Sequence, residues 1–369
     1  MRFPYKASPH IKKGMTTNEI LNIVLVSLIF VSVWSIYNQY VVFGAYAAID
    51  TILILVFSCV MALVSHYLFY LLFDKLENKK FNSFAERFTS NTKRVFNGAP
   101  LVTALILALC LPAGTPLYVV IVSIIFAEIF SKLIFGGFGS NIFNPAAVGF
   151  VFAGIAFGSN LVVPQVYDAV TSATPLSEFA RLDWYMSDSQ GLAFIDSMGG
   201  FMSILLGTVP GAIGETATVA IFIAFFYMVY KRALDWTVTA TIIGTSFVIA
   251  WLYGIYLGVG IWYPFFHVLT GGIIFGAVFM ATDPVTNPIN RQGRIIFAIF
   301  LGALTMLIRF SSSHTEGVAY SILIMNMFVP IIDQKTANLT NVETHKKIFG
   351  IAVCFVIAVA VVLSFAIFM

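Results

Sequence analysis

The sequence is poor in charge. Only 10% of its 369 residues are charged and 59% are hydrophobic, whereas a soluble domain carries about 25% charged residues. The net charge of +3 is too small to indicate a nucleic-acid partner. These shortages exclude an ordinary soluble protein and predict an all-α polytopic membrane protein.

Cysteine is also scarce. Cys59, Cys110 and Cys354 all lie in hydrophobic runs, without Cys-x-x-Cys spacing, so they are expected to be small buried hydrophobic residues. An iron–sulfur cluster held by this chain alone is therefore not expected. No Gly-x-Gly-x-x-Gly follows a strand-like segment, so a dinucleotide such as NAD⁺ would have to bind another chain.

The hydrophobic runs are long enough to span a membrane, which takes about 20 residues. They predict ten or eleven transmembrane helices, and the clearest runs are 20–37, 51–73, 116–135, 237–257, 263–281, 295–310, 317–332 and 348–369. We divide the chain into a polar tail (1–18), a membrane domain (19–335) and a C-terminal extension (336–369) with room for one extra helix.

Loop charge predicts the orientation. Residues 74–97 hold six bases and three acids, whereas residues 159–200 hold five acids and one base. Because Lys and Arg accumulate on the cytoplasmic side of membranes, we place 74–97 and the amino terminus in the cytoplasm and 159–200 outside. The protein is expected to be a multi-pass protein of the cell membrane.

Two segments, 99–111 and 146–158, are too short to span alone and lie beside Pro or Gly. They predict broken half-helices. A weak internal repeat accompanies them, since 136–145 and 281–288 both end a helix in a polar turn interrupted by proline. Paired breaks of this kind point to a site where two halves of a transporter-like fold meet. Chance sharing of Asn-Pro is the alternative.

The acidic loop contains a short pattern, Asp168-x-x-Thr171-Ser172-Ala173-Thr174. It resembles the site Asp-x-x-Ser/Thr-Gly-Ala-Thr at which a flavin transferase attaches FMN, through its phosphate, to the last threonine. Ser172 replaces the usual glycine but is still small, and the following proline is expected to keep Thr174 out of a helix. The resemblance implies covalent FMN on Thr174, and an ordinary turn rich in Ser and Thr is the alternative.

Several separated stretches resemble one family, the D subunit of the Rnf ferredoxin:NAD⁺ oxidoreductase and the B subunit of the sodium-pumping NADH:quinone reductase. They are 8–17, 135–146, 210–216, 279–285 and 316–333. The amino terminus and the length favour the Rnf D subunit, and the hydrophobic tail after residue 333 departs from both. The resemblance implies an electron-carrying subunit that couples electron transfer to Na⁺ or H⁺ movement, with no complete active site of its own.

The same resemblance implies a second, non-covalent flavin, such as riboflavin, near Asn141 and Asn144. Amides can hydrogen-bond a flavin ring edge, although both residues could simply cap broken helices. Gly214 and Thr216 are expected at the start of a helix, where free N–H groups could receive the flavin phosphate. Glu215 between them favours a helix cap instead.

Three acids beside the bilayer, Asp50, Asp283 and Asp333, are candidates for a cation path, and Asp283 is the strongest. Because a proline follows it, Asp283 could equally be a turn residue. Arg309 and His267 lie near helix ends and are expected to reach toward the membrane surface.

Three functions compete. The first is a subunit of an ion-pumping redox complex, with other Rnf subunits, the flavin transferase and lipid as partners, or the quinone-reductase equivalent. The second is a channel or transporter for a small solute, which would not need the pattern ending at Thr174. The third is a flavin-bearing membrane anchor that passes electrons but pumps nothing, which only coupling measurements would separate from the first.

Overall fold

The computed structural model describes residues 15–76, 81, 83–158, 161, 174–182, 184–215, 217–311, 317–337 and 344–368. Every named element in these ranges is a helix, and their only β-type pairing is an isolated bridge between Pro112 and Ala212. The predicted all-α class is confirmed.

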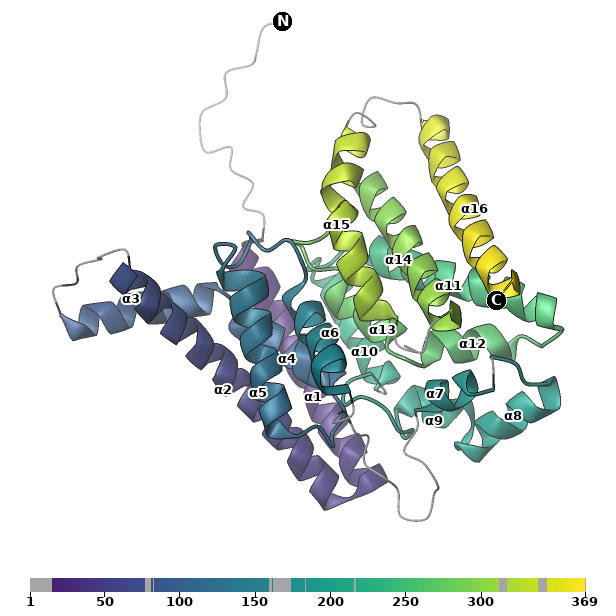
Figure 1. Ribbon diagram of the computed structural model, residues 1–369, viewed down its shortest axis with the longest axis horizontal. Helices are drawn as coiled ribbons and strands as arrows, with labels where there is room; N and C mark the ends of the chain where they lie inside the picture. Colours follow the sequence, from purple (N-terminus) through teal and green to yellow (C-terminus); the bar gives the residue numbers. More distant parts are fainter. Residues whose placement is uncertain are drawn as a thin grey trace, which may run out of the picture.

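The first half of the chain builds one group of helices (Figure 1). In α1 a capping box closes the first turn, because Thr16 and Glu19 satisfy each other's backbone N–H groups. Helix α2 packs on α1, α4 and α5. The bounds are α1 Thr17–Phe43, α2 Ala45–Leu76, α3 Phe84–Asn97, α4 Pro100–Cys110, α5 Leu117–Ile125, η1 Phe126–Leu133 and α6 Pro145–Phe157.

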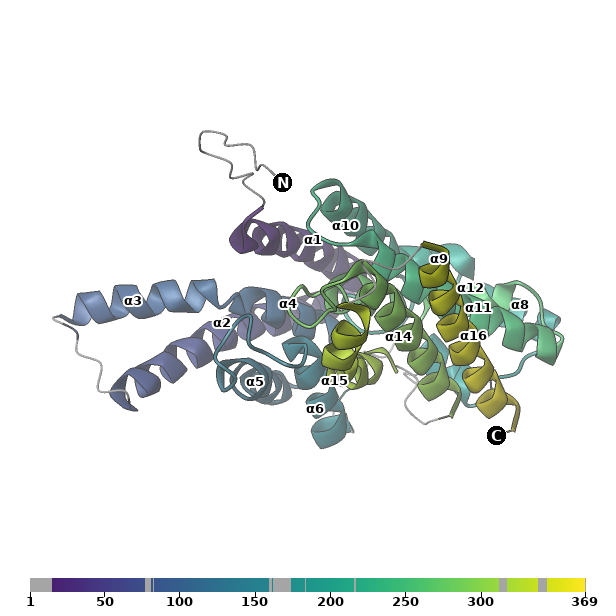
Figure 2. The same cartoon turned by 90° about the horizontal axis from the view of Figure 1, so that it is seen from above.

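The second half forms a group around α14, which packs on α11, α15 and α16. The two groups meet where α1 packs on α10 and α6 packs on α15. The bounds are α10 Thr218–Tyr230, α11 Trp236–Leu257, α12 Trp262–Leu269, α13 Ile273–Phe275, η3 Gly276–Met280, α14 Arg291–Ser311, α15 Val318–Thr336 and α16 Thr344–Phe368. Figure 2 shows α3 and the end of α2 extending away from the rest of the molecule.

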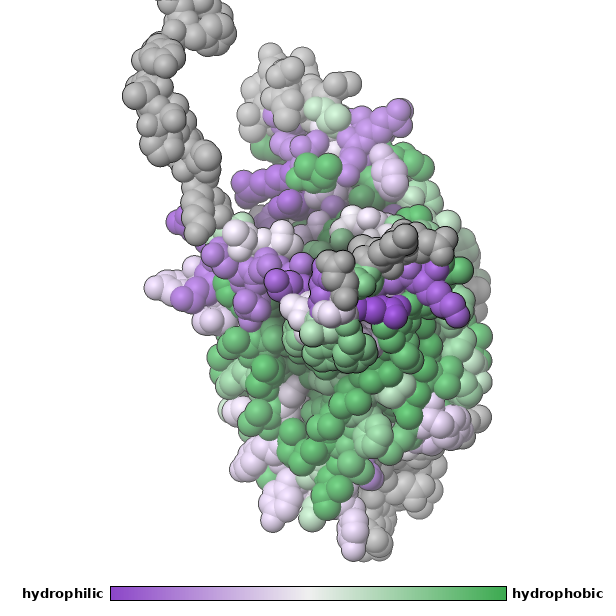
Figure 3. All heavy atoms as spheres, turned by 90° about the vertical axis from the view of Figure 1, so that its left-hand side faces the viewer, coloured by the Kyte–Doolittle hydropathy of each residue, from purple (hydrophilic) through white to green (hydrophobic). Residues whose placement is uncertain are grey.

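Five helices of the described part, α1, α2, α11, α14 and α16, are long and hydrophobic enough to cross a membrane alone. Two bent pairs, α3–α4 and α12–η3, raise this number to seven, and α6 and α10 are shorter apolar helices. Figure 3 shows a broad hydrophobic band with hydrophilic residues above it, as a membrane protein requires. The total of ten or eleven crossings stays a prediction.

The segment 99–111 forms α4, which is half of a broken helix as predicted, whereas 146–158 forms the single short helix α6. The segment 263–281, expected to be one continuous helix, is the second broken helix. Helix α3 meets α4 at 49°, and α12 meets α13–η3 at 59°. The second break depends on Gly271 and Gly272, which both have φ of +70°, a conformation that costs glycine little. At the end of α4, the Ile213 N–H donates to Leu111 O (3.0 Å). This bond satisfies a carbonyl that a helix end would otherwise leave unpaired in lipid.

The expectation that Arg309 and His267 reach toward the membrane surface is wrong. Both side chains are wholly buried. The Arg309 guanidinium donates to the carbonyls of His267 (2.6 Å), Thr270 (3.3 Å) and Gly271 (3.2 Å). A buried cation therefore compensates the exposed carbonyl end of α12, where the helix dipole is negative.

The acidic loop is folded where it is described. It forms α7 Pro175–Ala180 and α8 Asp188–Ser197, and α9 Gly200–Leu206 follows it. These helices lie at the lower right of Figure 1, away from α3. Asp188 accepts hydrogen bonds from the Gly260 N–H (2.6 Å) and the Trp262 Nε1–H (2.7 Å). These bonds hold α8 against the start of α12 and keep the pKa of Asp188 below its ordinary range.

Candidate functional site

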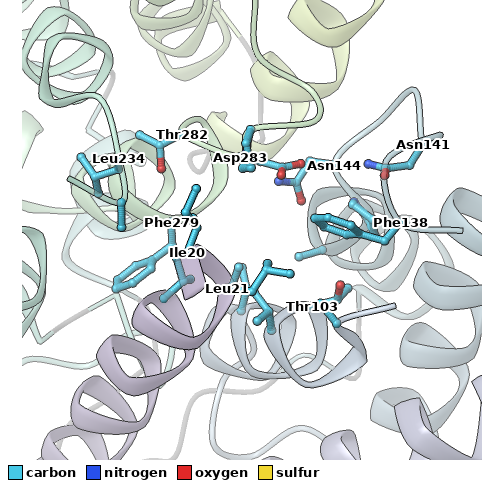
Figure 4. A pocket seen from close by; sticks show the side chains of 18 of the residues that line it. Ile20, Leu21, Thr103, Phe138, Asn141, Asn144, Leu234, Phe279, Thr282 and Asp283 are labelled. Atoms are coloured by element: carbon cyan, nitrogen blue, oxygen red, sulfur yellow. The ribbon is translucent and has the colours of Figure 1, made fainter. Parts of the chain in front are cut away.

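A cavity lies where the two polar turns of the internal repeat meet (Figure 4). The first turn contributes Phe138, Asn141 and Asn144, and the second contributes Thr282 and Asp283. Helices α1, α4 and α10 complete the walls, and the cavity holds about 710 Å³ when the space open to solvent is counted. The predicted meeting of the two halves is confirmed.

Each turn follows a segment of π-helix. Segment η1 ends at Leu133 before the first turn, and η3 ends at Met280 before the second. A π-helix is rare, and single turns of it occur frequently at functional sites. In this protein both hydrophobic helices end at the cavity in a segment of π-helix. The two polar turns are therefore similar in the helix that precedes them as well as in their Asn-Pro sequences.

Asn144 ties the two turns together. Its Oδ1 accepts the Ala147 N–H (3.2 Å) as the N-cap of α6, and its Nδ2 donates to Met280 O (3.0 Å). Its backbone N–H donates to Asn326 Oδ1 (3.0 Å), and Asn326 Nδ2 donates to Thr286 O (3.0 Å). The alternative that Asn144 caps a broken helix is therefore confirmed, and its side chain has a second, interhelical bond.

Asn141, unlike Asn144, has one side-chain atom without a hydrogen-bond partner among the described residues. Its Nδ2 donates to Phe143 O (3.1 Å), but its buried Oδ1 has no hydrogen-bond partner among the described residues. A buried acceptor without a partner costs free energy, and Asn141 lines the cavity. The site thus fits a ligand that offers a hydrogen-bond donor, as the ring edge of a flavin does.

Asp283 is both a turn residue and a cavity residue. Its carboxylate accepts from the Val285 N–H (3.3 Å) and the Thr286 hydroxyl (3.0 Å). Burial raises the pKa of Asp283, although these two bonds and the Lys132 charge act in the opposite direction. Asp333 accepts from the Ile289 N–H (2.9 Å), near the same turn, whereas Asp50 lies exposed on α2 and does not line the cavity.

Thr174 lies at a second, smaller pocket. Its backbone is extended (φ −65°, ψ 153°) as the N-cap of α7, as its position before Pro175 predicts. Its Oγ1 accepts the Ser177 N–H and donates to Ser177 Oγ, both at 3.2 Å. The half-buried hydroxyl stands beside Thr270 and Gly271, at the break in α12–η3. The other members of the attachment pattern, Asp168, Thr171, Ser172 and Ala173, lie outside the described residues.

The predicted phosphate-binding helix start is wrong for Gly214. Helix α10 begins at Thr218, later than expected, and the Gly214 N–H donates to Leu109 O (2.7 Å). The cap assigned to Glu215 is also wrong, because Ala217 is the N-cap and no side chain caps α10. Glu215 lines the Thr174 pocket instead, and Thr216 lies outside the described residues.

Three ionisable residues inside the membrane domain were not predicted as candidates from the sequence. Glu128 and Lys132 lie on η1, and His66 on α2 faces them. Glu128 and Lys132 are two charges within the hydrophobic run 116–135, and charged residues at such positions are functional candidates. This signal was available from the sequence, whereas the approach of His66 from 62 residues away was not.

Comparison with known proteins identifies the family to which the chain belongs. The NQR2, RnfD, RnfE family matches residues 5–341. The D subunit of the proton-translocating ferredoxin:NAD(+) oxidoreductase complex of Clostridium ljungdahlii is 33% identical over 90% of this chain and 94% of its own. The D subunit of the Na(+)-translocating ferredoxin:NAD(+) oxidoreductase complex of Acetobacterium woodii is 30% identical over 94% of each chain.

A third relative is the B subunit of the Na(+)-translocating NADH-quinone reductase of Chromohalobacter salexigens. It is 33% identical, but the match covers only 63% of this chain and 56% of that protein. The D subunits are therefore matched nearly end to end and the B subunit is not, as the amino terminus and length predicted. By these matches the chain belongs to the NQR2, RnfD, RnfE family.

Proposed function

We propose that this protein is the D subunit of an Rnf-type complex, which passes electrons between ferredoxin and NAD⁺ and couples them to Na⁺ or H⁺ movement. Its nearly full-length similarity to two D subunits supports the proposal. Those relatives are named for different ions, so the proposal covers both ions. NAD⁺ and ferredoxin bind other subunits of the complex.

The observation that carries the electron-transfer role is the position of Thr174. The flavin-attachment pattern ends at this residue, and its hydroxyl stands in a pocket beside the break in α12–η3. Attachment of FMN through a phosphodiester would remove the Thr174 proton and its bond to Ser177 Oγ. The bond from the Ser177 N–H could persist, because the ester oxygen still accepts.

A channel for a small solute is the weaker alternative. The paired broken helices fit such a channel as well as they fit a redox protein. The pattern at Thr174 has no use in a channel, so the state of this one residue separates the two functions.

Flavin attachment can be tested on the complex purified from its native host. The denatured protein should keep flavin fluorescence, and the peptide that contains Thr174 should gain the mass of FMN less one water. The Thr174→Val variant should lose both signals, because it lacks the nucleophilic oxygen. An unmodified Thr174 peptide in host material would refute the assignment.

A matched control is Ser177→Ala. This variant removes the hydrogen bond from the Thr174 hydroxyl to Ser177 Oγ, but it keeps the Thr174 oxygen to which the flavin phosphate would be attached. Flavin attachment should therefore persist in this variant. Its loss in both variants would indicate that the fold of α7, and not the nucleophile, decides the modification.

We also propose that the cavity between the two turns holds the second, non-covalent flavin. The unpartnered Oδ1 of Asn141 supports this assignment. The Asn141→Leu variant should lower the affinity of that flavin by about 0.5–1.5 kcal/mol, the net value of one hydrogen bond. Acid extraction measures the effect, since it releases only non-covalent flavin; unchanged release would place the second flavin elsewhere.

A further inference from the structure

Three ionisable side chains form a buried cluster beside the cavity. His66 on α2 approaches Glu128 on η1, with 2.7 Å between Nε2 and Oε2. Lys132, one turn later on η1, lies 3.2 Å from the same carboxylate oxygen. The side chains of His66, Glu128 and Lys132 are 0%, 0% and 2% exposed. Charges this deeply buried are costly, so the cluster needs an explanation beyond stability.

The cluster connects two places. At one end, Lys132 lines the cavity, donates to Ala99 O (3.3 Å) and Thr103 Oγ1 (3.1 Å), and lies 6.0 Å from the ring of Phe138. At the other end, the imidazole of His66 faces the junction between α3 and α4. A Cβ atom at Gly98 would lie only 2.9 Å from His66 Nδ1. The backbone of Gly98 therefore packs directly on the imidazole, whose Nδ1 is buried at this junction.

Only one of the two imidazole nitrogens of His66 has a hydrogen-bond partner among the described residues. An ionised Glu128 only accepts, so His66 Nε2 must carry the proton of their shared bond. In the neutral imidazole Nδ1 is then bare, and it has no hydrogen-bond partner among the described residues. Glu128 Oε1 also has no partner in this part of the chain. The next proton that the cluster accepts would bind at His66 Nδ1.

Whether His66 can bind that proton depends on the net charge of the cluster. With neutral His66, the Glu128 carboxylate and the Lys132 ammonium cancel, and protonation of His66 leaves a net charge of +1. A net charge inside a protein is costly unless an opposite charge lies nearby. Negative charge placed in the cavity beside Lys132 would supply it.

Other charged and titratable groups surround the cluster. Tyr70 lies one turn from His66 on α2, with ring centroids 6.2 Å apart. The Arg94 guanidinium on α3 stacks over Tyr70 at 4.3 Å and pairs with Asp74 at 2.7 Å. Asp283 lines the cavity together with Lys132. The charges of Arg94 and Asp74 cancel each other. The charge that changes near the cluster is therefore the charge inside the cavity.

The arrangement of this cluster does not suit a metal ion. The Lys132 ammonium lies within 3.2 Å of the Glu128 oxygen that a metal ion would need, and its like charge would repel that ion. A proton binds at Nδ1 of the imidazole, away from the ammonium.

We propose that His66, Glu128 and Lys132 form a proton-loading site for the cavity, an inference that rests on the proposed flavin there. When the complex delivers one electron to the cavity ligand, His66 Nδ1 binds one proton that comes from the bulk solvent. When the electron leaves, Nδ1 returns the proton. One negative and one positive charge enter and leave together, so the net charge of the region is unchanged.

The test is the pH dependence of the midpoint potential of the non-covalent flavin in the purified complex. Linked uptake of one proton per electron lowers the potential by about 59 mV per pH unit. His66→Gln keeps an N–H that can donate to Glu128 but cannot take up a proton. Its potential should vary clearly less with pH than that of the wild type.

Two further variants sharpen the test. Tyr70→Phe keeps the ring beside His66 and leaves the cluster intact, so its pH dependence should match the wild type. Gly98→Ala keeps every charged group, but its Cβ would press on the imidazole, so it should reduce the pH dependence even if His66→Gln fails to assemble.

The outcomes separate the two proposals. If the flavin is present and both His66→Gln and Gly98→Ala keep the wild-type pH dependence, the proton-loading site is refuted while the flavin site stands. If acid extraction releases no non-covalent flavin from the wild-type complex, the proposed flavin site fails, and this inference fails with it.

Discussion

The hydrogen bonds of the Asn144 side chain should contribute strongly to the stability of the contact between the two halves of the membrane domain. Asn144→Ala removes the N-cap of α6, which is worth about 0.5–2 kcal/mol. It also leaves Met280 O buried without its donor, which costs about 1–3 kcal/mol. We therefore expect the free energy of unfolding to fall by about 2–4 kcal/mol, read as a lower midpoint of thermal or denaturant unfolding in detergent.

Two comparisons make this prediction specific. Asn141→Ala breaks one bond within its own turn, to Phe143 O, and should cost only about 1 kcal/mol. Asn326→Ala removes the acceptor of the Asn144 N–H and the donor to Thr286 O. Its effect should be non-additive with that of Asn144→Ala, because both residues join the same two turns. A loss below about 0.5 kcal/mol for Asn144→Ala, the size of an ordinary surface substitution, would refute the reasoning.

Three further predictions follow from the fold. Cysteines introduced at Ser83 and Ser189, both exposed, should react with an impermeant reagent on intact cells only at Ser189, and labelling of both would overturn the charge-based orientation. Arg309→Met should destabilise the protein in detergent by about 3–5 kcal/mol, because three buried carbonyls lose their donor; a melting temperature equal to wild type would contradict that role. Because the pKa of Asp188 is lower in the folded protein than the value of about 3.9 in the unfolded chain, ionised Asp188 stabilises the fold above that unfolded pKa. This stabilisation is lost as the pH falls through the lower pKa of the folded protein. Asp188→Asn should abolish that acid-dependent step in tryptophan fluorescence, and a step unchanged in the variant would assign it to another group.

The sequence predicted the helical class and the short helix α4 because both depend on local composition. Hydrophobic length and low charge define the spans, but the break at Gly271 and Gly272 lies inside a run that was expected to be one helix, 263–281. The joining of the two polar turns was also predictable, because the repeated Asn-Pro sequence is visible without coordinates. All three cysteines lie in helices, but only Cys110 is buried as predicted, whereas Cys59 and Cys354 are half-buried.

Predictions from the sequence were wrong where a polar group forms its hydrogen bonds with a distant segment. Gly214 was expected to offer a free N–H, but α4 supplies an acceptor from a distant part of the chain, Leu109 O. Arg309 was expected at the membrane surface, but the carbonyls of the α12 break accept its bonds inside the protein. Local pattern identifies a helix end or a charge, whereas the partner that satisfies it is a property of the tertiary structure.

The bent helix α12–η3 joins the two candidate flavin sites. Gly271, at its break, lines the Thr174 pocket, and Phe279, near its other end, lines the cavity. Between them, Gly271, Gly276 and Met280 line a small intermediate pocket with Glu215. Arg309 fixes the break at one end, and the Asn144 bond to Met280 O fixes the other. A movement of this helix would therefore change both sites together, which is the kind of shared element that coupling electron transfer to ion movement requires.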